Sequence, residues 1–394
     1  MPPSILQIFN AYLEKGGEEA IVDRITEVLR RQFPVEDCGF SSHDWQAPEA
    51  PPGWQQAAWT LWNPASLRKL RETQASCRAN VWLVHNVFPV GSAAIFREAI
   101  VQRIPVLYYI HNFRPFSVNG SLWAGDAMAP GGLRRNYWRE IRHGAWQNSR
   151  VKTAWFAFVL HAMRAMGWFR AIKGWVAISE FMRQCFIEAG VPAEDIFTIP
   201  HFWNARPEPS LRDDGYFLFL GRLITAKGLR VLFEAWSHVE EALGESAPRL
   251  VIGGMGPLEA EVRKACAASR LIKFAGHVGG QEKSDLIAGC AAMLAPSLWW
   301  EPLGLVTYEA YDYGKPMLAA RSGGLTETVI DGSTGLLHTP GAARELADQV
   351  IRLHRDPGLR REMGARGRTW LLEHASEALW LERFQKAVSH VLAS

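Results

Sequence analysis

Two carboxylates, Glu301 and Glu309, stand eight residues apart in the segment EPLGLVTYEA, directly after the apolar run CAAMLAPSLWW. If the apolar run is a strand and a helix begins near Gly304, Glu301 lies just before the helix and Glu309 about a turn and a half inside it. The carboxylates are then separated by roughly 12 Å, about the span from sugar to ribose in a nucleotide sugar. Between them, the first-turn amides of Gly304, Leu305 and Val306 would favour a diphosphate.

Two other loops that follow expected strands add groups suited to an anion. Arg222 and Lys227 share the loop GRLITAKGL, and two cations beside a crevice suit a diphosphate, although basic loop residues are more often solvated surface. Gly16 and Gly17 stand in YLEKGGEEA. Adjacent glycines let backbone amides approach an anion at the start of a helix, although a plain turn is the simpler explanation.

The segment IGGMGPLEAE has the start of a dinucleotide-binding fingerprint, but the third glycine is missing. The next expected strand, IKFAGH, ends in His277 and not in the acid that would hold a ribose. An oxidoreductase with a nicotinamide cofactor is therefore a weak alternative. We expect Gly254 in this loop to let the backbone pass close to another kind of nucleotide.

Short apolar runs alternate with helical patterns along the chain, which predicts an α/β fold with parallel sheets of βαβ units. The alternation stops at WNARPEPSLRDDG and then restarts. We therefore expect two Rossmann-like, doubly wound domains that face each other across a cleft. Their expected boundaries are 1–202 for an acceptor-side domain, 203–212 for a linker, 213–375 for the nucleotide-sugar-binding domain and 376–394 for a helix able to pack back on the N-terminal domain.

The composition, 48% hydrophobic and 21% charged with a net charge of +3, is that of a soluble globular protein and gives no reason to expect a nucleic-acid partner. Five scattered cysteines form no CxxC pair, and no His cluster or D-x-D motif is present, so no metal is expected. The N-terminus lacks the features of a signal peptide, and no run of 18 apolar residues occurs. We therefore expect a cytoplasmic location.

At the E-x7-E segment the sequence resembles the retaining GT-B glycosyltransferases of family GT4, a group that includes many bacterial polysaccharide and lipid-sugar transferases. The resemblance covers nearly the whole chain, through GGEE, AISEFMRQCFIEAGVPAEDIFTIPHF, GRLITAKGL, IGGMGPLE, APSLWWEPLGLVTYEA and GGLTETVIDGSTGLL in this order. It implies a GT-B fold. It also implies transfer of a sugar, with retention, from a nucleoside-diphosphate sugar to a hydroxyl of a glycan, lipid-linked or small-molecule acceptor.

The resemblance assigns roles in the second half of the chain. Arg222 and Lys227 match the pair that binds the donor diphosphate, Glu309 matches the ribose-binding acid, and Glu301 matches the acid near the donor sugar. The family's same-face mechanism uses the leaving diphosphate to help deprotonate the acceptor. Arg222, Lys227 and the helix amides would hold its charge without a metal.

In the first half, Gly16 and Gly17 match the glycine loop that closes over the donor. His111 matches a histidine that reaches the transferred sugar from the N-terminal domain, so the implied catalytic set adds His111 to Glu301, Arg222 and Lys227. His201 stands where the family usually has Asn and receives no role. A second hypothesis is a non-catalytic GT-B subunit that binds a sugar nucleotide or glycan without turnover.

Residues 131–175 hold nine cations, one acid and many interleaved aromatic residues. This composition suits a helix in an anionic membrane interface, and an equally good explanation is core packing with a solvated basic face. Because the family often uses lipid-linked acceptors, we also expect peripheral attachment to the inner face of a membrane and an anionic acceptor.

Overall fold

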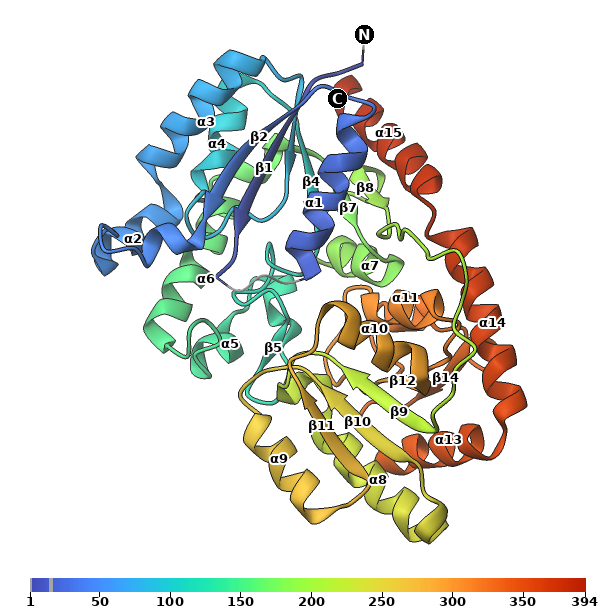
Figure 1. Cartoon of the computed structure of the whole chain (residues 1–394). Helices are drawn as coiled ribbons and strands as arrows, with labels where there is room; N and C mark the ends of the chain where they lie inside the picture. Colours follow the sequence, from blue (N-terminus) through green and yellow to red (C-terminus); the bar gives the residue numbers. More distant parts are fainter. Residues whose placement is uncertain (1, 14–16) are drawn as a thin grey trace. The chain divides into compact units, whose positions relative to one another are not determined.

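The computed structural model describes residues 2–13 and 17–394, which form two compact units (Figure 1). The first unit comprises the residues up to Gly125, Ala129–His201 and Glu377–Ser394, and the second comprises Asp126–Met128 and Phe202–Ser376. Each unit contains a six-stranded parallel sheet. The expected α/β class with two Rossmann-like domains is therefore confirmed, whereas the cleft between them stays a prediction.

The first sheet has the strand order β2-β1-β3-β4-β7-β8, with parallel neighbours throughout. The runs VWLV and VLYYI form β3 and β4 and are buried along their whole length, which is typical of parallel strands covered on both faces. The strands are β1 Ile5–Ala11, β2 Val35–Ser41, β3 Val81–Val84, β4 Val106–Ile110, β7 Ile172–Ala177 and β8 Ile196–Thr198. A short two-stranded sheet of β5 Trp123–Ala124 and β6 Ala127–Met128 lies in the connection that follows β4.

Side-chain caps begin several helices of the first unit. Asn63, Ser149 and Ser179 each accept a hydrogen bond from a first-turn amide, which satisfies a donor that the helix itself leaves open. The helices are α1 Gly17–Arg30, α2 Gly53–Leu61, α3 Pro64–Cys77, α4 Ala94–Gln102, α5 Trp138–Arg142, α6 Arg150–Ala165, α7 Glu180–Glu188 and α15 Glu377–Ala393, with 3₁₀ helices η1 Ser42–Trp45, η2 Pro130–Arg134, η3 Trp168–Ala171 and η4 Ala193–Asp195. Across residues 2–13 and 17–394, no helix is both long and apolar enough to span a bilayer.

Helix α15 returns to the first unit after the chain has completed the second one (Figure 1). It packs on β3, β4 and β7, and its buried face includes Trp380 and Phe384. Gly174 in β7 permits this contact, because a Cβ atom there would lie 2.6 Å from Cγ2 of Val391. The helix therefore closes one face of the first sheet.

The second sheet has the order β11-β10-β9-β12-β13-β14, again with parallel neighbours. Its strands are β9 Tyr216–Leu220, β10 Arg249–Gly253, β11 Ile272–Gly276, β12 Cys290–Ala295, β13 Met317–Ala320 and β14 Gly335–His338. The surrounding helices are α8 Leu229–Leu243, α9 Glu259–Ala268, α10 Gly280–Gly289, α11 Leu305–Asp312, α12 Leu325–Thr328, α13 Ala343–Arg355 and α14 Pro357–His374, with η5 Thr225–Lys227 and η6 Gly244–Ser246. The strand β12 is buried throughout, and Trp236 of α8 packs in the core beneath the sheet.

The segment expected as a linker, 203–212, is bonded along the second unit. The Arg206 amide donates to Oδ1 of Asp312 at 2.7 Å, and the Arg368 guanidinium donates to the same oxygen at 2.8 Å and to the Arg206 carbonyl. Ser210 donates from its amide to the Tyr313 carbonyl at 3.0 Å. These hydrogen bonds tie Arg206 and Ser210 of the segment to the second unit, while most of its other residues are exposed.

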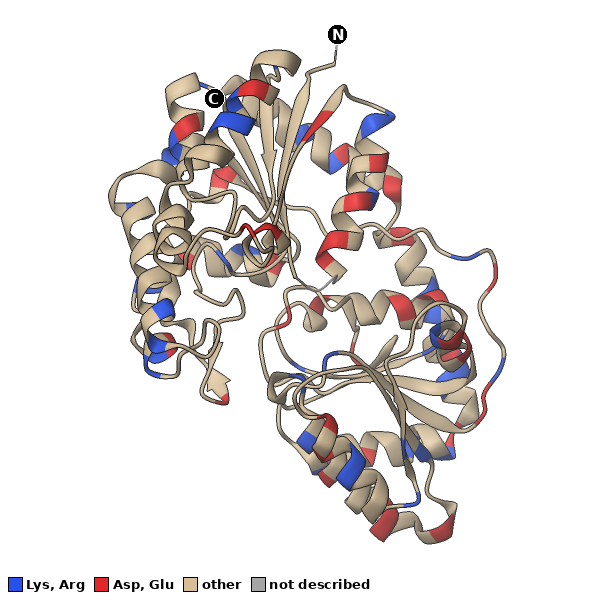
Figure 2. Ribbon diagram, turned by 60° about the vertical axis from the view of Figure 1, so that its left-hand side comes forward, with Lys and Arg blue, Asp and Glu red and all other residues tan. Residues whose placement is uncertain are grey.

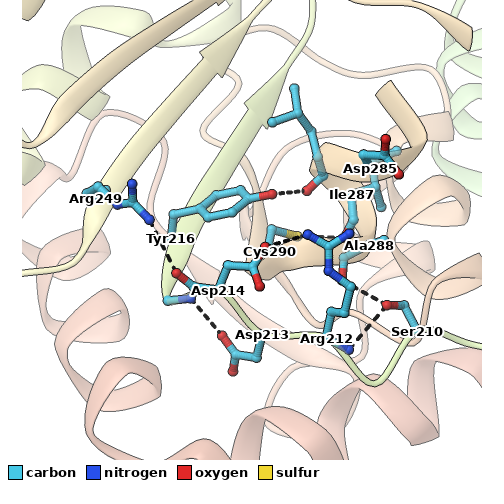
Figure 3. Close-up of polar contacts among 12 residues, drawn as sticks. Ser210, Arg212, Asp213, Asp214, Tyr216, Arg249, Asp285, Ile287, Ala288 and Cys290 are labelled. Atoms are coloured by element: carbon cyan, nitrogen blue, oxygen red, sulfur yellow. Dashed lines mark hydrogen bonds and ion pairs between the residues drawn. The ribbon is translucent and has the colours of Figure 1, made fainter. Parts of the chain in front are cut away.

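Further contacts fasten the start of β9 (Figure 3). Arg212 forms an ion pair with Asp214 at 2.7 Å, and the Tyr216 hydroxyl donates to the Leu286 carbonyl at 2.6 Å. The Ser210 hydroxyl donates to the Ala288 carbonyl at 2.9 Å. These hydrogen bonds tie the amino end of β9 to the end of α10.

We expect Arg368→Ala to lower the free energy of unfolding of the second unit by roughly 3–5 kcal/mol. Arg368 and Asp312 are both buried, so removal of the guanidinium leaves a buried carboxylate whose remaining cation, Arg206, lies 3.6 Å away. Thermal and urea unfolding measure the loss. The matched control is Arg366→Ala in the same helix, whose ion pair with Glu362 is solvent-exposed and should contribute less than about 1 kcal/mol. Equal stability of the two variants would contradict the prediction.

Candidate functional site

The helix expected near Gly304 begins at Leu305, as α11. Gly304 adopts a φ of +89°, and a Cβ atom there would lie 2.5 Å from Cδ2 of Leu325, so both conformation and space require glycine. Thr307 donates its amide to the Gly304 carbonyl at 2.9 Å. The amides of Leu305 and Val306 have no acceptor in the part of the chain that the structure describes. They are therefore available to an anion.

Glu301 lies in the loop between β12 and α11 and is only 6% exposed. Its Oε1 atom accepts three hydrogen bonds, from Lys227 Nζ at 2.5 Å, from Ser297 Oγ at 2.5 Å and from Trp299 Nε1 at 2.8 Å. The Lys227 ammonium also lies 5.2 Å from the centroid of the Trp299 ring. Burial raises the pKa of Glu301, but the charge of Lys227 and these hydrogen bonds outweigh it and hold the pKa below its ordinary value. Glu301 is thus a fixed, ionised acceptor.

Two glycines hold the backbone of Glu301. A Cβ atom on Gly323 would lie 2.3 Å from the Glu301 carbonyl oxygen, and the Gly324 amide donates to that oxygen at 2.7 Å. The sequence offers a signal for them in the segment GGLTE, to which we assigned no individual role. Their function here is to let the loop after β13 press against the loop that carries Glu301.

Glu309 lies in α11 and is paired with a residue that the sequence did not single out. Lys283 of α10 donates from Nζ to Oε1 of Glu309 at 2.7 Å, and both side chains are partly exposed. No motif marks Lys283, because its position beside α11 follows from the packing of two helices. The acid predicted to bind a ribose therefore already has a cation beside it.

The two cations of the loop after β9 have different surroundings. Lys227, in η5, is bound to Glu301, whereas Arg222 is exposed and has no ion-pair partner among residues 2–13 and 17–394. Gly254, with a φ of +146°, brings the loop after β10 against this loop, because a Cβ atom there would lie 1.8 Å from the Gly221 carbonyl oxygen. The close approach that Gly254 allows is thus to the chain itself, and its predicted contact with a nucleotide stays a prediction.

In the first unit, Gly16 lies outside the described residues, and Gly17 is the exposed first residue of α1. The next residue, Glu18, was missed by the sequence reasoning. Its Oε2 atom accepts hydrogen bonds from the Tyr12 hydroxyl at 3.1 Å and from Asn112 Nδ2 at 2.9 Å. Burial, opposed by these hydrogen bonds, raises the pKa of Glu18 to about 7. A carboxyl that titrates near neutrality therefore lies at the carboxyl edge of the first sheet.

His111 belongs to a buried row of three histidines. His85 follows β3, His111 follows β4 and His201 follows β8. Nδ1 of His85 lies 2.9 Å from Nε2 of His111, and Nδ1 of His111 lies 3.5 Å from Nε2 of His201. Burial lowers the pKa of His85 and of His201 to about 3, and burial with the neighbouring histidines lowers that of His111 well below its ordinary value. All three are neutral at physiological pH, and both nitrogens of His111 already face a histidine.

Comparison with known proteins gives a family match for the second unit. Residues 202–370 match the family model described as glycosyl transferases group 1. The D-inositol 3-phosphate glycosyltransferase of Kribbella flavida is 30% identical over 187 residues, which are 45% of this chain and 43% of that protein. The phosphatidyl-myo-inositol mannosyltransferase of Mycobacterium leprae is 26% identical over 363 residues, 89% of this chain and 87% of that protein. The chain therefore spans less than half the length of the Kribbella flavida relative.

Solved structures resemble the whole chain. Sucrose-phosphate synthase from Thermosynechococcus elongatus has a TM-score of 0.72 at 18% identity and covers 100% of both chains. HepE of Anabaena, solved with UDP and glucose, has a TM-score of 0.67 at 18% identity, with 98% of this chain and 99% of that chain covered. Likeness at this level of identity concerns the fold alone. It confirms the GT-B fold that the sequence predicts.

Proposed function

We propose that this chain, a member of the group 1 glycosyl transferases through its residues 202–370, transfers a sugar from a nucleoside-diphosphate sugar to a hydroxyl group. The observation that carries the proposal is the ionised Glu301 bound to Lys227 beside the open amides of α11. This arrangement offers a hydroxyl acceptor and an anion site a few residues apart. The named activities of the relatives, an inositol phosphate glycosyltransferase and a phosphatidylinositol mannosyltransferase, support the reaction class.

The second unit would bind the donor. An ammonium has three hydrogens, of which Lys227 gives one to Glu301, so two remain for diphosphate oxygens. The exposed Arg222 and the amides of Leu305 and Val306 would hold further oxygens. Glu309 would accept hydrogens from the ribose. As charge grows on the leaving diphosphate, these donors stabilise it without a metal ion.

Retention is proposed to follow the same-face route. Three hydrogen bonds on one oxygen of Glu301 stabilise its charge and make it a poor nucleophile, so Glu301 is not set up for a covalent intermediate. The leaving diphosphate would instead take the proton of the acceptor hydroxyl. Both nitrogens of His111 face other histidines, so a direct contact with the sugar requires His111 to exchange one of these hydrogen bonds.

A non-catalytic binding subunit is the alternative. It would bind a nucleoside-diphosphate sugar but release no nucleoside diphosphate. The weaker oxidoreductase alternative would require nicotinamide binding, and neither the family match nor the related activities support it.

The first unit would hold the acceptor, and its surface suits an anionic membrane. Helix α6 has two apolar faces, one buried and the other formed by Val151, Trp155 and Phe158, of which Val151 is 81% and Phe158 51% exposed. On α5, Trp138 is 67% exposed. Spacing of three and four residues places the exposed apolar residues of α6 on one stripe. Much of 151–170 is thus core, and the stripe is the part that we propose for membrane contact.

The charges on helix α6 have one sign. Helix α6 carries Arg150, Lys152 and Arg164 and no acid, whereas the helices of the second unit carry both signs (Figure 2). The one acid of residues 131–175, Glu140, is buried. An apolar stripe with basic neighbours binds an interface rich in anionic lipid. We therefore propose peripheral membrane attachment and an anionic, lipid-linked acceptor.

We expect Glu309→Ala to weaken binding of a nucleoside diphosphate about ten- to a hundredfold, the equivalent of a lost hydrogen bond to a charged group, and Glu301→Ala to lower turnover while the nucleotide still binds. Calorimetry with UDP and GDP measures the first effect, and release of nucleoside diphosphate measures the second. Glu282→Ala, an exposed acid on α10, is the control and should change neither quantity. Equal loss of nucleotide affinity in both variants would contradict the assignment of Glu309 to the ribose and of Glu301 to the transferred sugar.

Turnover should survive an excess of EDTA, because side-chain cations and helix amides neutralise the diphosphate in this proposal. The assay measures nucleoside diphosphate released before and after chelation. Loss of turnover on chelation, with recovery on addition of Mg²⁺ or Mn²⁺, would refute metal-independent transfer.

The chain should sediment with vesicles that contain phosphatidylglycerol, and less so with neutral ones, at low salt. Each cation near the surface contributes about 1 kcal/mol, and its effect falls off within a Debye length of about 8 Å at physiological salt, so binding should weaken steeply as salt rises. Phe158→Ser should reduce binding, whereas Leu372→Ser, a similarly exposed apolar residue of α14, should not. Equal binding to neutral and anionic vesicles would contradict the proposal that the stripe on α6 binds an anionic membrane.

A further inference from the structure

The histidine row of the first unit continues into a tyrosine and a tryptophan. Tyr109 lies on β4, two residues before His111, and Trp380 lies on α15. The Tyr109 hydroxyl lies 3.4 Å from Nδ1 of His201, and Nε1 of Trp380 lies 3.0 Å from that hydroxyl. All of these side chains are buried. The row runs from Trp380 through Tyr109, His201 and His111 to His85.

Two neighbours of Tyr109 have fixed roles and therefore decide where its hydrogen lies. The indole of Trp380 can only donate, so the Tyr109 oxygen accepts its hydrogen bond. The Ile199 carbonyl can only accept, and it lies 3.2 Å from the Tyr109 oxygen, closer than His201. The single hydrogen of Tyr109 goes to Ile199, so Tyr109 presents a lone pair to His201.

The lone pair that Tyr109 presents to His201 determines which ring nitrogen carries the hydrogen in each of the three histidines. Because Tyr109 presents a lone pair, Nδ1 of His201 carries the hydrogen, and its Nε2 atom is an acceptor. Nδ1 of His111 then donates to His201, and Nε2 of His111 accepts from Nδ1 of His85. A neutral imidazole carries a hydrogen on only one of its two ring nitrogens. Because that hydrogen is on Nδ1 of His85, Nε2 of His85 has a lone pair without a donor at the end of the row.

The opposite direction is disfavoured at the Tyr109 end. It would turn the Tyr109 hydrogen toward His201 and away from the Ile199 carbonyl, which is the nearer acceptor. At the other end of the row, Nε2 of His85 is buried and has no partner in the part of the chain that the structure describes.

We propose that Tyr109 fixes His85, His111 and His201 as Nδ1–H tautomers and thereby presents the Nε2 lone pair of His85 as the acceptor for a hydroxyl group. A neutral lone pair accepts a hydrogen and repels the oxygens of phosphate or carboxylate, so the matching ligand is a neutral hydrogen-bond donor such as a hydroxyl group. His85 is enclosed in this structure, and the donor is either a buried water or, resting on the proposed function, a hydroxyl of the bound sugar. Tyr109, His201 and His111 act through His85 and are positioning residues.

The first test reads the tautomers directly, in the full chain labelled with ¹⁵N-histidine, by long-range ¹H–¹⁵N correlation spectra. Substitution of each histidine by Gln assigns the signals. We expect the Nδ1–H pattern for all three residues from pH 6 to pH 8. A hydrogen on Nε2 of His85 or of His111 would overturn the proposal. The measurement requires no turnover, so its failure is distinct from a failure of the proposed function.

The second test compares two variants of the same buried row. In Tyr109→Phe, either direction leaves one N–H and one lone pair of the row without a partner, so His111 should change from a single tautomer to a mixture of two. In Trp380→Phe, Tyr109 still gives its hydrogen to Ile199, so the single tautomer should remain. Trp380→Phe removes more buried volume and should lower the thermal midpoint further. A single Nδ1–H tautomer in Tyr109→Phe would show that Tyr109 does not set the direction and would overturn the inference.

The third test identifies the source of the hydroxyl, with UDP-glucose and UDP as probes. A shift of the His85 Nε2 signal on addition of UDP-glucose, beyond the shift with UDP at equal saturation, assigns a sugar hydroxyl. An equal signal with both probes excludes the sugar hydroxyl and leaves a buried water as the donor. A signal typical of a protonated imidazole with either probe would mean that this end of the row binds an anion, which would overturn the proposal.

Discussion

The ion pair of Lys227 and Glu301 fixes the geometry on which the candidate donor site depends. Lys227 follows β9 and Glu301 follows β12, which are neighbouring parallel strands, so both loops emerge at the same edge of the sheet. The loops also bind each other through their backbones, because the Leu298 amide donates to the Ala226 carbonyl at 2.8 Å. Gly228 makes this possible, since a Cβ atom there would lie 1.9 Å from the Pro296 carbonyl oxygen.

The ion pair of Lys227 and Glu301 is important for the stability of this site because neither side chain is fully exposed to water. A buried carboxylate without its cation is costly, so any rearrangement that separates Lys227 from Glu301 must supply another partner. The position of α11 follows from the same loop, because Gly304 turns the chain from Glu301 into the helix. One interaction therefore sets both the carboxylate and the helix amides beside it.

The sequence predicts the local features of this site and misses the pairings. A glycine directly before an apolar helical pattern predicts the start of α11. The signal is local, because the positive φ of Gly304 depends on that residue and its immediate neighbours. The contact between Lys283 and Glu309 depends instead on how two helices pack. The row from His85 to Trp380 depends on strand order and on a helix 271 residues beyond Tyr109. The sequence of 203–212 predicts a linker because it is rich in proline and charge. The partners of its polar groups, such as Asp312, are far away in the sequence and become apparent only in the folded unit.

The return of α15 to the first unit has a consequence for how the chain folds during synthesis. Domains generally fold as units in the order in which they are made. Here residues 377–394 are made after the whole of the second unit, yet they cover β3, β4 and β7 of the first. Until then the first sheet lacks Trp380 and Phe384 over one of its faces, and its contacts with α15 close a loop of well over a hundred residues. The unit whose synthesis begins first is therefore the one whose fold is completed last.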